Sequence, residues 1–224
     1  MDIAKEPQNQ SQFNTYEKFG GVRLGPYTSH IWRDDPKHLS FLLARYKFCS
    51  KILYNKKRVL EIGCGDSLGT PVVLQSVESI HAVDFEPIVI KDAINRNEYK
   101  DRCTYQVHDI TKGSINSEFD GAFSLDVIEH IPEELEINFI RNIAKSLKDD
   151  AILIVGTPNI TANEYASPAS KEGHINLKSA ETLRKLIAYS FENVIIFSMN
   201  DELVHTGYYP MAHYLLGIGI GKLR

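Results

Sequence analysis

Short runs of consecutive apolar residues alternate along the chain with longer segments in which apolar residues recur every three or four positions. The runs are typical of strands buried on both faces, and the longer segments are typical of amphipathic helices. The predicted strands cover residues 58–63, 80–85, 103–110, 119–128, 151–158, 191–199 and 213–223. The predicted helices cover residues 70–78, 87–99, 133–148 and 179–190, the last with Ser179 as its N-cap. This order predicts an α/β fold, a doubly wound and mostly parallel sheet with helices on both faces.

The N-terminal part has a different pattern. Residues 1–15 are polar and rich in Gln and Asn, and we expect a disordered tail there. Residues 16–55 are expected to form a helical cap, with Asp35 capping a helix whose first residue is Pro36. Residues 56–224 then form one domain, into which a long polar insertion, residues 158–178, is placed.

Composition narrows the class of partner. The 224 residues carry a net charge of −4 and lack a basic block, which argues against a nucleic-acid partner. Three scattered cysteines are too few for a disulfide framework. No apolar run approaches the roughly 20 residues that cross a bilayer, and the polar start lacks the layout of a signal peptide. We therefore expect a cytoplasmic protein with a small-molecule partner and no membrane association.

The stretch "VLEIGCGDSLGT", residues 59–70, ends a predicted strand in a loop with three glycines. Such a loop lets backbone N–H groups approach a ligand at the carboxyl end of a parallel sheet. A dinucleotide fingerprint needs G-x-G-x-x-G, but Leu68 stands at the third glycine position. Glu61, which precedes the loop, would repel a pyrophosphate but suits a cationic ligand.

This stretch resembles the first motif, E/D-x-G-x-G-x-G, of the class I S-adenosylmethionine-dependent methyltransferases, with Ser67 in place of the last glycine. The resemblance implies a Rossmann-like sheet of seven strands in the order 3-2-1-4-5-7-6. It also implies that the loop lies along the methionine part of S-adenosylmethionine.

Two further acids end the next two predicted strands. Asp84 follows the glycines by about 20 residues, the spacing at which a carboxylate reaches both ribose hydroxyls. By the resemblance, Asp109 accepts from the adenine amino group, with Ile110 beside the ring. Cys64 is interpreted as a small loop residue without a nucleophilic role. The full predicted cofactor-binding set is Glu61, Gly63, Cys64, Gly65, Asp84, Phe85, Asp109, Ile110 and Asp126.

The fourth strand ends in "SLDVIEHIP", residues 124–132, which allows three interpretations. His130, with Glu129 beside it, could be the catalytic general base. Alternatively, Asp126, Glu129, His130 and the distant His174 could hold Mg²⁺, Mn²⁺, Fe²⁺ or Zn²⁺. The D/E-x-x-E-H pattern resembles that of metal-dependent methyltransferases acting on quinone precursors and on RNA ends. In the third interpretation Asp126 borders the cofactor, and Glu129 and His130 only begin the next helix.

The acceptor is expected to lie beside the insertion, with Tyr165 and His174 as candidate contacts. Tyr27 and Trp32 of the N-terminal cap are further candidates, although Trp32 also suits packing within the cap. We expect methyl transfer to a hydroxyl of a small polar molecule, such as a sugar or glycan precursor. An Asn/Asp-Pro-Pro-Tyr signature is missing after the fourth strand, which argues against nucleobase and glutamine amino groups.

Several alternatives stay open at this point. The acceptor could be a phenol of the quinone type or a small-molecule amine. The chain could also be a non-catalytic nucleotide-binding module or an NAD-type oxidoreductase. The apolar and aromatic C-terminal stretch fits either a last strand or the interface of a homodimer.

Overall fold

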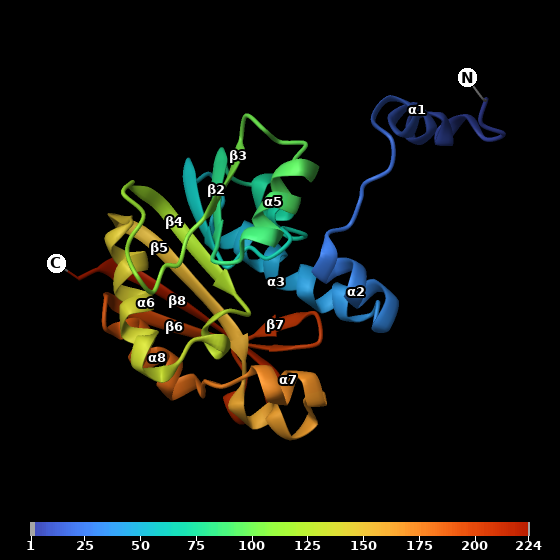
Figure 1. Cartoon of the computed structure of the whole chain (residues 1–224). Coiled ribbons are helices and arrows are strands. Elements are labelled where there is room, and N and C mark those ends of the chain that lie inside the picture. Colours follow the sequence, from blue (N-terminus) through green and yellow to red (C-terminus); the bar gives the residue numbers. More distant parts are fainter. Residues whose placement is uncertain (1–2, 224) are drawn as a thin grey trace.

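The structure is a computed structural model, and it describes residues 3–223. Its centre is an eight-stranded sheet of order β3-β2-β1-β4-β5-β8-β6-β7 (Figure 1). The strands are β1 Arg58–Ile62, β2 Ser79–Asp84, β3 Cys103–Val107, β4 Phe119–Leu125, β5 Leu147–Pro158, β6 Phe191–Asn200, β7 Leu203–His205 and β8 Tyr214–Lys222. Strands β1 to β5 pair in parallel, whereas β8 runs antiparallel between β5 and β6.

The predicted sheet order is confirmed, with one strand added. The seven predicted strands occupy the predicted places, because the closing strand 213–223 lies between the fifth and sixth as β8. The added strand β7 has three residues and pairs only with β6, so it leaves no periodic pattern in the sequence. Neighbours β1 and β4 lead to opposite halves of the sheet, and ligands bind beyond the carboxyl ends of strands at such a point.

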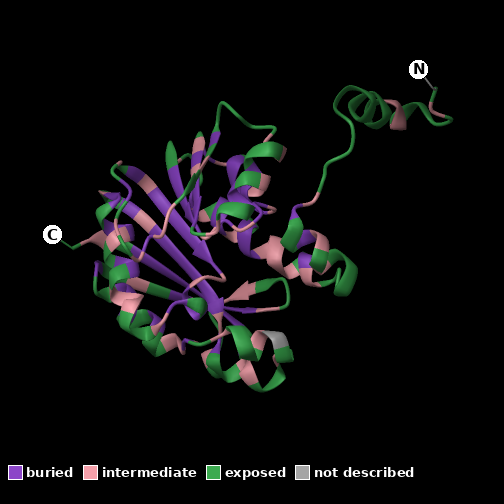
Figure 2. Ribbon diagram, viewed as in Figure 1, coloured by how far each residue is buried: buried purple, intermediate pink, exposed green. Residues whose placement is uncertain are grey.

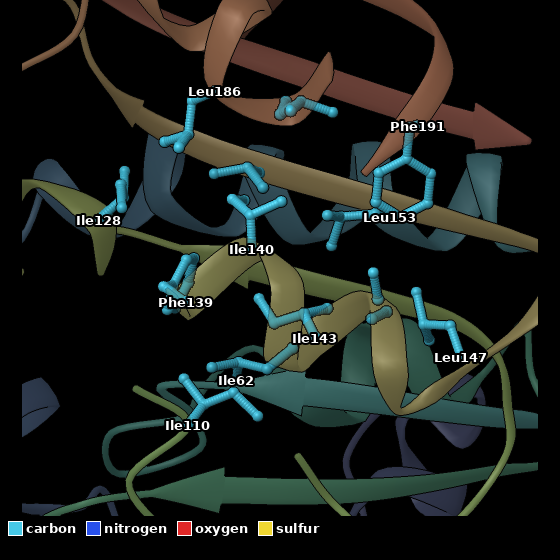
Figure 3. Packing of buried hydrophobic residues seen from close by; sticks show 14 of the residues in the cluster. Ile62, Ile110, Ile128, Phe139, Ile140, Ile143, Leu147, Leu153, Leu186 and Phe191 are labelled. Carbon is cyan, nitrogen blue, oxygen red and sulfur yellow. The ribbon is translucent and has the colours of Figure 1, made fainter. Parts of the chain in front are cut away.

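Helices cover both faces of the sheet and bury it. Helices α3 His38–Ile52, α4 Thr70–Leu74 and α5 Pro87–Arg96 contribute to one core, and α6 Glu133–Lys145 and α8 Ala180–Ala188 contribute to the other. Figure 3 shows Phe139, Ile140 and Ile143 of α6 in the second core. The strands between the two layers are buried over most of their length (Figure 2). As predicted, Ser179 caps α8, in a capping box with Thr182.

The N-terminal part differs from expectation in two ways. Where a disordered tail was expected, the chain forms η1 Pro7–Asn9 and α1 Gln10–Phe19, which project from the body and bury none of their residues (Figure 1). The predicted cap at Asp35 is wrong. Asp35 instead ends helix α2 Pro26–Asp34, where its N–H donates to the Ile31 carbonyl, and α3 begins only at His38.

The insertion 158–178 is folded. It forms η3 Ile160–Tyr165 and α7 Pro168–Gly173, with the Ser167 hydroxyl capping α7. Two other short turns, η2 Ile128–His130 and η4 Tyr209–Met211, complete the described elements. Over residues 3–223, none of the helices combines the length and apolar character that crossing a membrane requires.

Candidate active site

The glycine loop between β1 and α4 has a backbone that suits few residues. Gly63 and Gly65 have φ of +71° and +51°, and Ser67 follows at +63°. A Cβ at Gly63 would lie 2.2 Å from Cγ2 of Val127, so the loop passes the β4 end in direct contact. The Gly65 N–H donates to Oδ2 of Asp84 at 2.9 Å, which ties the loop to the end of β2.

Glu61 lies below this loop and lines neither of the two cavities described below. Its side chain is 1% exposed, and Oε2 accepts from the Thr70 hydroxyl at 2.7 Å. Thr70 also bonds the Ser67 hydroxyl, so the three residues link β1, the loop and α4. Among the described residues, Glu61 Oε1 has no hydrogen-bond partner, and burial raises the pKa of this carboxyl to about 8. The structure therefore gives Glu61 a supporting place, where sequence had predicted a cofactor contact.

A cavity of about 570 Å³ opens at the carboxyl ends of β1, β2 and β4. Its size lies within the range of small-molecule sites. Every predicted cofactor-binding residue except Glu61 lines it: Gly63, Cys64, Gly65, Asp84, Phe85, Asp109, Ile110 and Asp126. We call it the first cavity. Burial raises the pKa of the Cys64 thiol above its usual range, which fits the expected inert role.

The two strand-end acids are held by their own neighbourhoods. Asp84 is 8% exposed and accepts from the N–H groups of Gly65 and Glu86, both at 2.9 Å. Asp109 accepts from the N–H and hydroxyl of Thr111 and pairs with Lys112 at 2.9 Å. Burial alone would raise the pKa of the Asp109 carboxyl, but these partners outweigh it and lower the pKa. Both acids thus present fixed oxygens at the cavity edge.

Asp126 is held by a cation from the N-terminal cap. The residue has φ of +58°, and both its carboxylate oxygens lie 2.7 Å from Nη1 of Arg45 on α3. The Arg45 guanidinium lies 3.8 Å from the centre of the Tyr214 ring. Because Arg45 and Asp126 are 81 residues apart, no local sequence pattern predicts that they pair.

A second cavity of about 530 Å³ adjoins the first. The two share Ile31, Leu42, Asp126 and His130 as lining residues. The second cavity is also lined by residues of the insertion, among them the candidate acceptor contacts Tyr165 and His174 together with Asn159 and Asn163, and by Arg45, Glu129, His38 and His213. It therefore lies between the cap and the insertion, next to the first cavity.

The two predicted cap contacts have different outcomes. Tyr27 on α2 lines the first cavity, where its ring lies against Gly65. Trp32, also on α2, is 59% exposed and lines neither cavity, so the geometry does not support it as a substrate contact. Sequence reasoning missed several lining residues from the cap and the loop, namely Thr28, Ile31, Leu42, Arg45, Tyr46 and Asp66.

Glu129, His130 and His174 come together at the wall of the second cavity. One nitrogen or oxygen from each lies within 4.8 Å of those of the others, and the two imidazole centres are 5.2 Å apart. Glu129 is fully buried and accepts from the Thr157 hydroxyl at 3.0 Å. Its Oε1 lacks a hydrogen-bond partner within residues 3–223. Burial, followed by the charge of Asp126, raises the pKa of Glu129 well above its usual value.

His130 has a defined tautomer. Its Nδ1 lies 2.8 Å from the Gly173 carbonyl oxygen, which can only accept. Nδ1 therefore carries the proton, and the neutral ring keeps a lone pair on Nε2. Since His130 lines both cavities, this ring stands where they meet.

The sequence of this chain matches known proteins over much of its length. The profile of a family described as "Methyltransferase domain" matches residues 32–190. A ubiquinone biosynthesis O-methyltransferase of Xanthomonas campestris pv. campestris is 27% identical over 135 residues, 59% of this chain and 53% of the relative. The chain thus spans about half the length of the curated relatives it matches.

Two solved structures illustrate the shared fold. The N-methyltransferase NodS from Bradyrhizobium japonicum WM9, in complex with S-adenosyl-L-homocysteine, superposes with a TM-score of 0.63 at 17% identity, covering 85% of this chain and 90% of NodS. The methyltransferase domain of bacterial CtHen1-C gives 0.66 at 20% identity, covering 81% and 99%.

Proposed function

Since this chain belongs to the class I S-adenosylmethionine-dependent methyltransferase family, we propose that it moves the sulfonium methyl of S-adenosylmethionine to a hydroxyl of a small polar acceptor. The cofactor would lie in the first cavity and the acceptor in the second. The observation that carries the proposal is the shared wall of the two cavities, which includes Asp126 and His130. An in-line transfer needs its donor and acceptor in adjoining compartments.

Within the first cavity, the loop backbone at Gly63 and Gly65 would contact the methionine part of the cofactor. Asp84 would accept from the ribose hydroxyls with the lone pairs that its two N–H partners leave free. Asp109 would face the adenine amino group, with Phe85 and Ile110 offering apolar surface to the ring.

Methyl transfer to an aliphatic hydroxyl needs a base, because the neutral oxygen is a poor nucleophile. We assign this role to Nε2 of His130, whose lone pair follows from the Nδ1 hydrogen bond to Gly173. Glu129, buried beside it and hydrogen-bonded to Thr157, would help to position His130. A neutral amine acceptor would need less help, so a base at His130 would favour an oxygen acceptor.

A divalent cation is a second way to activate the acceptor. The residues present would fit such a cation, because Glu129, His130 and His174 offer a carboxylate and two imidazoles, which suit Zn²⁺, Fe²⁺ or Mn²⁺. Oε1 of Glu129 has no hydrogen-bond partner among the described residues and could therefore be a metal ligand. Asp126, the fourth predicted ligand, is outside this group and is already paired with Arg45. When bound, a cation would lower the pKa of the acceptor hydroxyl. Incubation with a chelator before the assay distinguishes a general base from a divalent cation. Activity that survives chelation but is lost in His130→Gln would support His130 as the general base.

A phenol of the quinone type is the second candidate acceptor. The curated relatives carry the name ubiquinone biosynthesis O-methyltransferase, and Ile31, Leu42 and Leu177 give the second cavity an apolar side. Such a phenol ionises more readily than an alcohol, so its methylation would depend less on His130.

The test is a binding and turnover series on the full chain. Thermal shifts with S-adenosylmethionine, S-adenosylhomocysteine and NAD establish the cofactor, since stabilisation grows with ligand concentration over Kd. Release of S-adenosylhomocysteine is then followed with panels of sugars, catechols and amines, each matched with its O- or N-methylated form as a blocked control. Turnover with amines alone would overturn oxygen transfer. Stabilisation by NAD alone would overturn the cofactor, and binding without turnover would favour a non-catalytic module.

A further inference from the structure

Helix α2 borders the first cavity but is weakly packed. Tyr27, Thr28 and Ile31 line the cavity from one side of this helix, opposite the strand ends. Of the nine residues of α2, all of them described, only Thr28 is buried. Figure 1 shows α2 beside α3, at the end of the strap that leads from α1. Elements with little apolar burial are the ones that open at low cost in free energy.

The one buried residue of α2 is held by the glycine loop. Oδ2 of Asp66 accepts from the Thr28 N–H at 2.7 Å, and Oδ1 accepts from the Thr28 hydroxyl at 2.9 Å. Both side chains are nearly inaccessible, Asp66 at 5% and Thr28 at 2%. Thr28 is the third residue of α2, so this carboxylate accepts from one of the free N–H groups of the helix start and interacts favourably with the helix dipole.

Asp66 replaces a cap that α2 cannot supply itself. The N-cap residue is Gly25, which has no side chain to accept from the first turn. A Cβ at Gly25 would lie 2.5 Å from Cβ of Asp66 and 2.6 Å from its Oδ2. The glycine therefore permits the close approach of the helix to the loop.

The loop side of this contact is anchored independently of α2. Nη2 of Arg96, on α5, donates to the backbone carbonyl of Asp66 at 2.6 Å. The same guanidinium binds Asp92 through Nε at 2.6 Å, within α5. Release of Thr28 would thus leave Asp66 in place, and α2 is the part that is free to move.

We propose that Asp66 and Thr28 form a latch that fastens α2 over the first cavity and retains the cofactor, which enters and leaves when the latch opens. The proposal rests on the assignment of the first cavity to the cofactor. Asp66 and Thr28 are positioning residues, because they act through the placement of Tyr27 and Ile31. The latch joins the loop that binds the cofactor to the helix that covers it, so dissociation and helix opening are one event.

The experiment compares Thr28→Val with Ser29→Ala in the full chain. Valine keeps the shape of threonine and removes only the hydroxyl bond to Asp66. Ser29→Ala removes the neighbouring hydroxyl, which bonds the Leu24 carbonyl. Dissociation of S-adenosylhomocysteine is followed by surface plasmon resonance. Loss of a hydrogen bond to a charged group corresponds to a dissociation rate about tenfold faster in Thr28→Val, with Ser29→Ala unchanged.

Hydrogen exchange of the unliganded proteins supplies a readout that needs no cofactor. Residues 26–34 should exchange about tenfold faster in Thr28→Val, while β1 exchanges at the wild-type rate. An Asp66→Ala variant, which removes both bonds, should exceed Thr28→Val in both measurements. Trp32, the single tryptophan of the chain, lies on α2, so its fluorescence anisotropy should be lower in Thr28→Val than in the wild type if the helix becomes more mobile.

The outcomes separate the latch from the cofactor assignment. If residues 26–34 exchange at the wild-type rate in both Thr28→Val and Asp66→Ala, the latch is overturned, whichever ligand the first cavity binds. If the wild type binds S-adenosylhomocysteine but the ligand dissociates equally fast from Thr28→Val and Ser29→Ala, only the retention role of the latch is overturned. Failure of the wild type to bind S-adenosylhomocysteine would overturn the cofactor assignment, and the retention role with it.

Discussion

The buried carboxyl of Glu61 should make the stability of the protein depend on pH in an unusual direction. Burial raises its pKa to about 8 from the usual 4.5, because the loss of solvent outweighs the hydrogen bonding that the carboxyl receives. In the unfolded chain this group loses its proton near pH 4.5, whereas the folded protein retains it. A group whose pKa is raised on folding makes the free energy of unfolding fall as pH rises between the two values, and the loss is complete above the folded pKa.

The magnitude follows from the shift. Each unit of pKa corresponds to 1.36 kcal/mol, so a carboxyl moved from 4.5 to about 8 loses roughly 5 kcal/mol over the whole window. Between pH 5.5 and 8.5 the part that is lost is about 3 kcal/mol. Glu61→Gln cannot ionise and keeps an oxygen for the Thr70 hydroxyl. Its unpaired amide costs about 1 kcal/mol at every pH.

Urea unfolding at pH 5.5 and 8.5 measures this effect in wild type and Glu61→Gln. At pH 5.5 the wild type has already lost about 1 kcal/mol, so the two proteins should be about equally stable, and at pH 8.5 the wild type should be less stable by about 3 kcal/mol. Subtraction removes other titrating groups, Glu129 among them. Glu78, an exposed carboxyl just before β2, supplies the matched control Glu78→Gln, whose stability relative to the wild type should not change with pH. A stability difference between the wild type and Glu61→Gln that stays constant, or that moves in favour of the wild type as pH rises, would refute the reasoning.

Three further outcomes test the site. His130→Gln should lower kcat by 10²- to 10⁴-fold with the S-adenosylmethionine KM unchanged, measured by S-adenosylhomocysteine release; equal kcat would remove His130 as the base. Gly63→Ala, which would place a Cβ 2.2 Å from Val127 at a φ of +71°, should cost about 2–4 kcal/mol and abolish cofactor binding, as seen in thermal melts with and without ligand. Arg45→Met should cost about 3 kcal/mol in urea unfolding, because Asp126 would lose its cation; an unchanged midpoint would show that the pair contributes nothing.

The place of the first cavity could be predicted from sequence because its signals are local. The apolar runs of β1 to β5, the positive φ positions at Gly63 and Gly65, and acids at the ends of β2 and β3 all occur within a few residues of the structure they specify. Parallel strands bring their carboxyl ends to one edge, so local patterns add up to a site. Sequence reasoning misjudged the N-terminal tail and the start of α3, and it missed the edge strand β7. Short or polar segments have too weak a hydrophobic periodicity to predict such elements.

Which side chains pair across the site was decided only in three dimensions. Asp126 is paired with Arg45 from 81 positions away, and Asp66 of the glycine loop holds Thr28 of α2, 38 positions away. Neither pair could be predicted from a sequence pattern, because the packing of elements remote in sequence determines which side chains meet.

The case of Glu61 shows the same limit within a single motif. Sequence places an acid at the end of β1 but does not say which way its side chain faces or what covers it. Packing of α3 and α4 encloses the carboxyl beneath the loop, 1% exposed, and makes it a buried support. Sequence by itself therefore determined the sheet, the glycine loop and the edge at which ligands bind, since backbone preference and periodicity are local properties. The tertiary structure decided which charges are buried, paired or free, since solvent exclusion and distance exist only once the helices have packed on the sheet.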